Sequence, residues 1–203
     1  MVRTNSTMLP LGTPLPAFDL PLVEYEHDGK GSRQTRMKKD SLEAKPVLLM
    51  VICAHCPFVK HIESQLTNLD NDYREQVQLI ALSSNSLVTH PQDGPEHLAE
   101  QARLNKWHFP YLLDLKQTLA KSLMAACTPD FFLFSVDNKD EHKLCYRGQL
   151  DESRPGNDIP VTGDDLRKAL DAVLSGKLLS EDQKPSIGCN IKWNPGSEPE
   201  WFG

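Results

Sequence analysis

Two cysteines, Cys53 and Cys56, are separated by two residues and lie directly before a stretch with helical periodicity. Thiols at this spacing can close a small disulfide ring, and a helix N-terminus lowers the pKa of a nearby thiol. His55 lies between them, where an imidazolium would stabilise a neighbouring thiolate. Pro57 suits the first helical turn, which does not need its missing N–H. The pattern indicates thiol–disulfide chemistry, with Cys53 as an exposed nucleophile and Cys56 as the thiol that resolves a mixed disulfide.

A Cys-x-x-Cys pair also arises by chance or as half of a zinc site. Structural zinc takes four ligands, and the remaining cysteines, Cys127, Cys145 and Cys189, form no second pair. We therefore expect no metal site and no cofactor.

Composition limits the classes of partner. The 203 residues include 22 Lys and Arg against 28 Asp and Glu, a net charge of −6 that argues against nucleic-acid and membrane partners. No apolar run is long enough to cross a membrane, and Pro10, Pro14 and Pro16 interrupt the layout of a secretory signal. The odd number of cysteines, 5, suits free or redox-active thiols better than a disulfide framework. We expect a cytoplasmic protein.

Strands and helices alternate around the cysteine pair. Residues 47–52 are continuously apolar, as in a strand buried on both faces of a parallel sheet, and run directly into Cys53. Periodicity predicts further strands at 77–82, 111–113, 131–134 and 143–147, and helices after Cys56 and at 96–106, 118–126 and 163–175. The loop at 83–93 has a length that is often functional. This order is typical of an α/β fold with a mixed central sheet flanked by helices.

A Thr128-Pro129 step precedes the strand at 131–134, which alone is unremarkable because proline is tolerated at strand starts. Together with other segments, however, the chain resembles the thioredoxin-like superfamily, in particular its peroxiredoxin-like branch related to alkyl hydroperoxide reductase and thiol-specific antioxidant proteins. The resemblance spans nearly the whole chain. It rests on residues Leu11–Pro21, Cys53–Lys60, Cys127–Phe134, Tyr146–Asn157 and Pro185–Trp193.

The resemblance implies a thioredoxin-like fold with an N-terminal β-hairpin extension. We expect one domain over residues 1–203, with a core at about 10–175 and a C-terminal tail at 176–203. In this fold a cis-proline, here Pro129, packs against the cysteine pair. The backbone of the residue before it, here Thr128, pairs with an extended substrate.

The implied activity is that of a thiol–disulfide oxidoreductase acting on protein thiols or disulfides. An alternative is an antioxidant thiol peroxidase that reduces a hydroperoxide and is recycled by a dithiol electron donor. In the peroxidase motif Pro-x-x-x-Thr/Ser-x-x-Cys, Cys56 would be the peroxidatic cysteine, with Cys53 in the Thr/Ser position and Leu49 in the Pro position. A third hypothesis is a non-catalytic module that senses redox state or holds a metal.

The remaining thiols and two arginines have alternative interpretations. Cys127 adjoins the Thr-Pro step and is either a supporting redox thiol or a small buried residue. Cys189, in the Pro- and Gly-rich tail, either reaches the active site as a resolving thiol or packs there, whereas Cys145 is expected in the core. Arg147 and Arg154 either stabilise a thiolate or are solvated.

Overall fold

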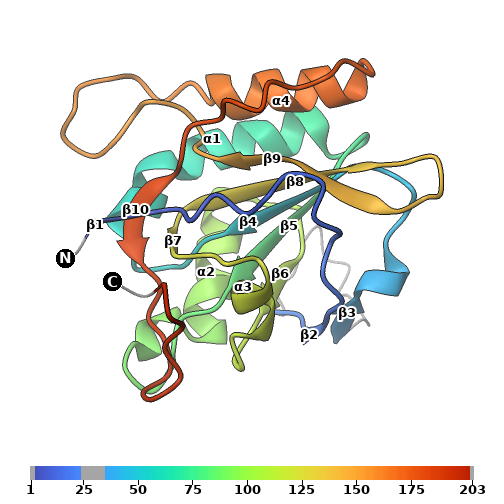
Figure 1. The fold of residues 1–203 in the computed structure, drawn as a ribbon. Coiled ribbons are helices and arrows are strands. Elements are labelled where there is room, and N and C mark those ends of the chain that lie inside the picture. Colours follow the sequence, from blue (N-terminus) through green and yellow to red (C-terminus); the bar gives the residue numbers. More distant parts are fainter. Residues whose placement is uncertain (1–2, 24–34, 202–203) are drawn as a thin grey trace.

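A five-stranded mixed sheet forms the centre of the protein, in a computed structural model that describes residues 3–23 and 35–201 (Figure 1). The strand order is β6-β5-β4-β8-β9, in which β4 pairs parallel with β5 and antiparallel with β8. The strands are β4 (Val47–Val51), β5 (Gln78–Ser83), β6 (Tyr111–Leu113), β8 (Asp130–Val136) and β9 (His142–Gly148). Every residue of β4 is buried, which confirms the central strand expected from its apolar run.

Helices cover both faces of this sheet. Figure 1 shows α1 and α4 on one side and α3 on the other. The helices are α1 (Pro57–Tyr73), α2 (Pro95–Asn105), α3 (Thr118–Ser122) and α4 (Asp164–Leu174), with short 3₁₀ turns η1 (Lys39–Ser41) and η2 (Pro91–Asp93). No helix in the described part of the chain is long and apolar enough to cross a membrane.

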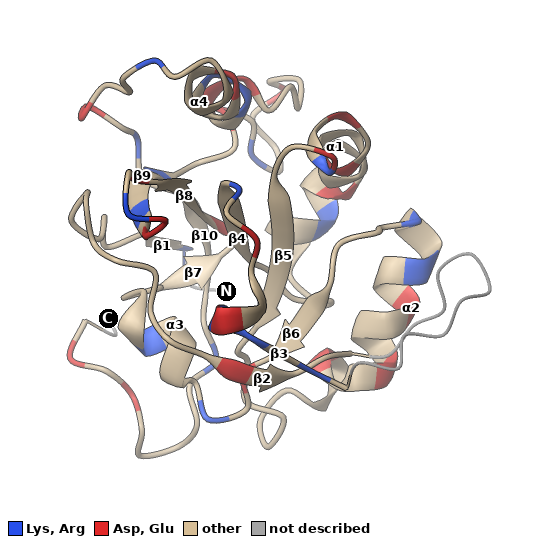
Figure 2. Ribbon diagram, turned by 90° about the vertical axis from the view of Figure 1, so that its right-hand side faces the viewer, with Lys and Arg blue, Asp and Glu red and all other residues tan. Residues whose placement is uncertain are grey.

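Charged residues follow this layering. Strands β4, β5 and β6 carry none, whereas α1, α2 and α4 carry both signs on their outer surfaces (Figure 2). Sheet residues pointing to one side pack with α1, α2 and α4 in one apolar cluster, and those pointing to the other side pack with α3 in a second. Burial of both faces explains why the parallel strands read as continuous apolar runs.

The helix expected at 118–126 is shorter than predicted. It ends at Ser122 because Met124 adopts a left-handed backbone conformation with φ of 51°, which a right-handed helix cannot accommodate. The chain then turns into β7 (Cys127–Thr128).

Two small sheets complete the fold. Strands β2 (Asp19–Pro21) and β3 (Arg36–Lys38) form the antiparallel pair expected of the N-terminal hairpin, although the residues that join them, 24–34, lie outside the described part. The second sheet was not predicted. Here β10 (Ile187–Asn190), from the tail, lies between β1 (Arg3–Asn5) and β7.

Candidate active site

The cysteine pair lies where β4 passes into α1. Strand β4 ends at Val51, and Cys56 is the extended N-cap residue of α1, followed by Pro57 at the first helical position. Since Pro57 has no N–H and a fixed φ, it suits that position. The sequence-based expectation of a strand, a short turn with the cysteines and a helix is therefore confirmed.

Sheet pairing brings Thr128 and Pro129 to the same place. Because β8 runs antiparallel to β4 with Asp130 opposite Val51, the residues just before β8 lie beside those just after β4. The Thr128-Pro129 peptide bond is cis. Thr128 Oγ1 lies 3.6 Å from Cys53 Sγ, and Thr128 O lies 3.3 Å from Cys56 Sγ. A single residue thus contacts both sulfurs.

Neither sulfur-bearing residue is exposed. Cys53 is 1% and Cys56 0% accessible to solvent, so the expectation that Cys53 is exposed is wrong. The physical reason is tertiary: the loop between β5 and α2 and the residue Thr128 pack over the turn that carries Cys53.

The two thiols differ in acidity, and Cys56, expected from the sequence to be the resolving thiol, is the more acidic of the two. Hydrogen bonds from the thiols of Cys189 and Cys53 lower the pKa of Cys56, and the N–H of Val59 in the first turn of α1 adds to this effect against the opposing effect of burial. Donation to Cys56, burial and the negative charge of Asp93 raise the pKa of Cys53. The reduced site therefore favours a thiolate at Cys56.

A buried carboxylate fixes the turn between the cysteines. The Oδ1 atom of Asp93 accepts hydrogen bonds from the backbone N–H groups of Ala54 at 3.0 Å and His55 at 3.1 Å. Its Oδ2 accepts from Asn85 Nδ2 at 2.8 Å and from His55 Nδ1 at 2.6 Å. Burial alone would raise the pKa of Asp93, but the hydrogen bonds from His55 and Asn85 hold it below the ordinary value. Nδ1 of His55 lies 3.9 Å from Cys53 Sγ.

Sequence reasoning did not single out Asp93 or Asn85, although it noted the length of their loop. A signal was available, because β5 runs parallel to β4. The loop after β5 and the turn after β4 therefore leave the same end of the sheet. An acidic residue in that loop is a candidate to meet the cysteine turn.

Cys53, His55 and Asp93 offer one potential metal ligand each, and the three atoms lie within 4.8 Å of one another. Structural zinc takes four ligands in a tetrahedron. Both oxygens of Asp93 are already engaged as hydrogen-bond acceptors. These hydrogen bonds account for the position of the carboxylate.

Strand β10 brings a third sulfur to the pair. Cys189 lies opposite Thr128 in the antiparallel ladder between β10 and β7, and its Sγ is 2.8 Å from Cys56 Sγ. The resemblance implied that the backbone of Thr128 pairs with an extended substrate. In this structure that backbone pairs with β10 of the chain's own tail. Of the two interpretations of Cys189, the structure supports the one that brings it to the active site.

Cys127, Cys145 and Arg147 each have a hydrogen-bond partner outside the cysteine pair. Burial and the charge of Asp130 raise the pKa of Cys127, whose Sγ faces the carbonyl oxygen of Pro129 at 3.7 Å. Cys145 is partly buried and donates to a strand carbonyl, as expected for a core position. Arg147 donates to Gln183.

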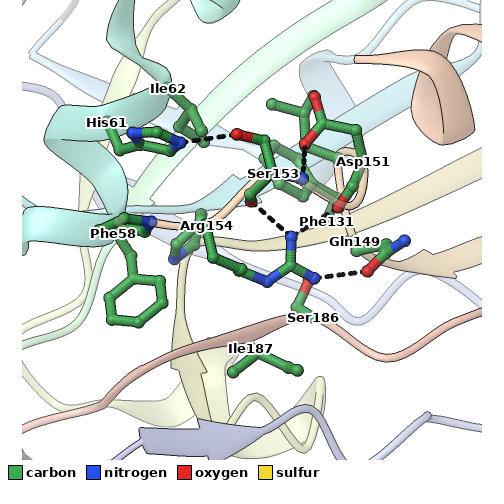
Figure 3. Close-up of a pocket in the computed structure, with 13 residues that line it drawn as sticks. Phe58, His61, Ile62, Phe131, Gln149, Asp151, Ser153, Arg154, Ser186 and Ile187 are labelled. Atoms are coloured by element: carbon green, nitrogen blue, oxygen red, sulfur yellow. Dashed lines mark hydrogen bonds between the residues drawn. The ribbon is translucent and has the colours of Figure 1, made fainter. Parts of the chain in front are cut away.

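Arg154 is bound within its own loop beside a small pocket that reaches Pro129 (Figure 3). Its guanidinium donates to the carbonyl oxygens of Asp151 and Ser153, both at 2.6 Å. The hydroxyl of Ser153 also contacts His61 Nε2 at 2.7 Å. The cavity, of about 20 Å³, has room for about one water molecule, so it offers no volume for a larger ligand.

Comparison with known proteins supports a thiol-based site. A family model described as "AhpC/TSA family" matches residues 11–147. No curated protein sequence matches the chain.

Two solved structures match nearly the whole chain, and a third matches its fold. An uncharacterized conserved protein from Geobacillus kaustophilus is 45% identical with a TM-score of 0.85, covering 97% of this chain and 99% of that one. A hypothetical protein from Sinorhizobium meliloti 1021 is 38% identical with a TM-score of 0.85, covering 95% and 100%. The thioredoxin domain of a thiol-disulfide oxidoreductase from Bacteroides vulgatus is 15% identical with a TM-score of 0.55, covering 80% and 99%. This last likeness concerns the fold, and it confirms the thioredoxin-like architecture.

Proposed function

The chain belongs to the AhpC/TSA family, and on that basis we propose that it is a thiol–disulfide oxidoreductase whose redox pair is Cys53 and Cys56. The observation that carries the proposal is that both sulfurs, which lie just before α1, contact Thr128 of β7. Two thiols held against one residue at a helix N-terminus are arranged to exchange with each other.

In this proposal Cys56 begins the exchange, because its pKa is lowered by the thiols of Cys189 and Cys53. The Cys56 thiolate attacks one sulfur of a substrate disulfide, and the other substrate sulfur leaves as a thiolate. Cys53 transfers its proton to that leaving thiolate, then attacks Cys56 Sγ and releases the second substrate thiolate. The substrate gains two electrons, and a dithiol electron donor returns them to the Cys53–Cys56 disulfide.

His55 and Asp93 act as positioning residues. Asp93 holds the backbone of the turn between the cysteines through the N–H groups of Ala54 and His55. It also orients the imidazole through Nδ1. Fixing the turn keeps Cys53 within reach of Cys56 throughout the cycle.

The partners that fit this chemistry are protein thiols or disulfides and a dithiol donor. We place the reaction in the cytoplasm, because reducing conditions keep such thiols available for turnover. The odd number of cysteines, 5, supports this placement.

Insulin reduction with dithiothreitol tests the proposal. Wild-type protein should accelerate the precipitation of reduced insulin chains, and Cys56→Ser should lose the acceleration. Cys145→Ser is the matched control and should retain it, since that thiol bonds to a strand carbonyl away from the pair. Equal rates for wild type and Cys56→Ser would overturn the proposal.

Thiol peroxidase activity is the second candidate, and the lowered pKa of Cys56 at the N-cap of α1 favours it. The Thr/Ser and Pro positions of the peroxidase motif hold Cys53 and Leu49 here, so we expect slow hydrogen peroxide consumption. Stopped-flow measurement decides between the two. A second-order rate constant above roughly 10⁵ M⁻¹s⁻¹, within the range of efficient enzymes, would place the peroxidase first.

A redox sensor or a metal-holding module would change state without turnover. Reversible oxidation of the pair, with neither insulin reduction nor peroxide consumption, would support the sensor. Stoichiometric metal in the purified protein, lost in Cys53→Ser, would support the metal module through the group formed by Cys53, His55 and Asp93.

A further inference from the structure

We propose that Cys189 is a third redox thiol, which forms a disulfide with Cys56 and so shares that sulfur with Cys53. The proposal deepens the thiol–disulfide function above and rests on it. Its basis is the meeting of the two sulfurs in the buried interior between α1 and β10.

The ladder of β10 sets the position of Cys189. Cys189 lies opposite Thr128 on β7 and opposite Arg3 on β1, so pairing with strands on both sides fixes the register of β10. Gly188 permits this close approach, because a Cβ atom there would collide with the carbonyl oxygen of Thr128. The backbone of β10 therefore lies directly against the residue that contacts both sulfurs of the pair.

The sulfur contact is already near bonding range. Cys56 Sγ and Cys189 Sγ are 2.8 Å apart, compared with about 2.05 Å in a disulfide. Both residues are buried, at 0% and 2% exposure. Little movement separates the thiol pair from a disulfide.

The exchange balances without an added oxidant. Starting from a Cys53–Cys56 disulfide, the thiolate of Cys189 attacks Cys56 Sγ, a Cys56–Cys189 bond forms and Cys53 leaves as a thiolate. The proton lost by Cys189 passes to Cys53, whose thiol form is favoured by burial and by Asp93. One disulfide forms as the other breaks, so the protein as a whole is neither oxidised nor reduced.

The same geometry gives Cys189 a role in releasing substrates. When Cys56 carries a mixed disulfide, attack by Cys189 on Cys56 Sγ expels the substrate thiolate, as attack by Cys53 does. Cys56 therefore has two resolving partners, one from the turn before α1 and one from the tail.

Peptide mapping distinguishes the two disulfides. Trypsin leaves Cys53 and Cys56 together in residues 40–60, since the bond after Lys45 precedes a proline, and leaves Cys189 in residues 178–192. A Cys53–Cys56 disulfide is a loop within one peptide, whereas a bond to Cys189 joins two peptides. Protein oxidised with glutathione disulfide and blocked with iodoacetamide should contain both products.

Cysteine variants identify which sulfur is bonded to Cys189. Cys53→Ser should give the joined peptides in full, which identifies Cys56 as the partner of Cys189. Cys189→Ser should give only the looped peptide. Cys145→Ser is the control and should match the wild type. Finding Cys189 alkylated after oxidation of Cys53→Ser would overturn the proposal.

A trapping experiment separates failure of this inference from failure of the proposed function. With a small aromatic disulfide, 5,5′-dithiobis(2-nitrobenzoate), Cys53→Ser should pass through the mixed disulfide at Cys56 and end as the joined peptides. The double variant Cys53→Ser/Cys189→Ser should retain the mixed disulfide. Equal trapping in both variants would overturn the role of Cys189 alone, and no reaction at Cys56 in either would overturn the proposed function.

Discussion

The Sγ atoms of Cys56 and Cys189 lie 2.8 Å apart although 133 positions separate the two residues in the chain. One belongs to the N-terminus of α1 and the other to β10, and Thr128 lies against both elements. The acidity of Cys56 therefore depends on the C-terminal tail as well as on its own helix.

Removing the thiol of Cys189 should make Cys56 less acidic. In the reduced Cys53→Ser background, Cys189→Ala removes a donor to the Cys56 thiolate, and the alkylation rate of Cys56 should fall by roughly tenfold to a hundredfold at a pH below the pKa of Cys56. A hydrogen bond to a charged acceptor contributes roughly 1.5–3 kcal/mol, and about 1.4 kcal/mol corresponds to a factor of ten. Mass spectrometry of the tryptic peptide measures the rate. Cys189→Ser retains a donor, so its alkylation rate should fall less. An equal fall in both variants would contradict this cause.

The disulfide between Cys56 and Cys189 should stabilise the fold. It would close a loop of 133 residues, and loops near that length lower the entropy of the unfolded chain by the equivalent of roughly 4–5 kcal/mol. Oxidised Cys53→Ser should therefore unfold at higher urea concentration than its reduced form. The double variant Cys53→Ser/Cys189→Ser should show no such difference, and an equal shift in both would point to another bond.

Local patterns predicted the elements around Cys53 and Cys56, because each depends on a few neighbouring residues. The apolar run of β4 and the 3.6-residue period of α1 are examples. The family resemblance predicted that Thr128 and Pro129 lie against the cysteine pair.

Contacts between residues far apart in the chain were harder to predict from the sequence. The sequence predicted no strand at 187–190, because β10 is short, contains Gly188 and owes its conformation to β1 and β7. The burial of Cys53 likewise depends on residues far along the chain, Asp93 and Thr128. The lowered pKa of Cys56 depends on another distant residue, Cys189.

Asp93→Asn should destabilise the protein near pH 7 by about 1–3 kcal/mol, the usual cost of disrupting buried hydrogen bonds. The folded-state pKa of Asp93 lies below 3.8, so its contribution is present above that pH and is lost as pH falls through the folded-state pKa. The difference from wild type in urea unfolding should therefore shrink in acid. Glu100→Gln, at an exposed position, is the control and should differ little at any pH. A constant difference across pH would contradict the electrostatic cause.

Asp130→Asn should stabilise the protein at alkaline pH. Burial raises the pKa of Asp130 well above 3.8, against weaker opposing effects of Ser186 and the N–H of Phe131. Between 3.8 and the raised value, the folded chain holds a proton that the unfolded chain releases, so wild-type stability falls as pH rises through this window. Asn is isosteric, keeps an acceptor for the N–H of Phe131 and has no proton to hold. Urea unfolding should show little difference between variant and wild type near pH 4 and a growing advantage for the variant toward pH 8. A variant that is less stable than wild type by the same amount at both pH values would show that the carboxyl contributes through hydrogen bonding rather than through its buried proton.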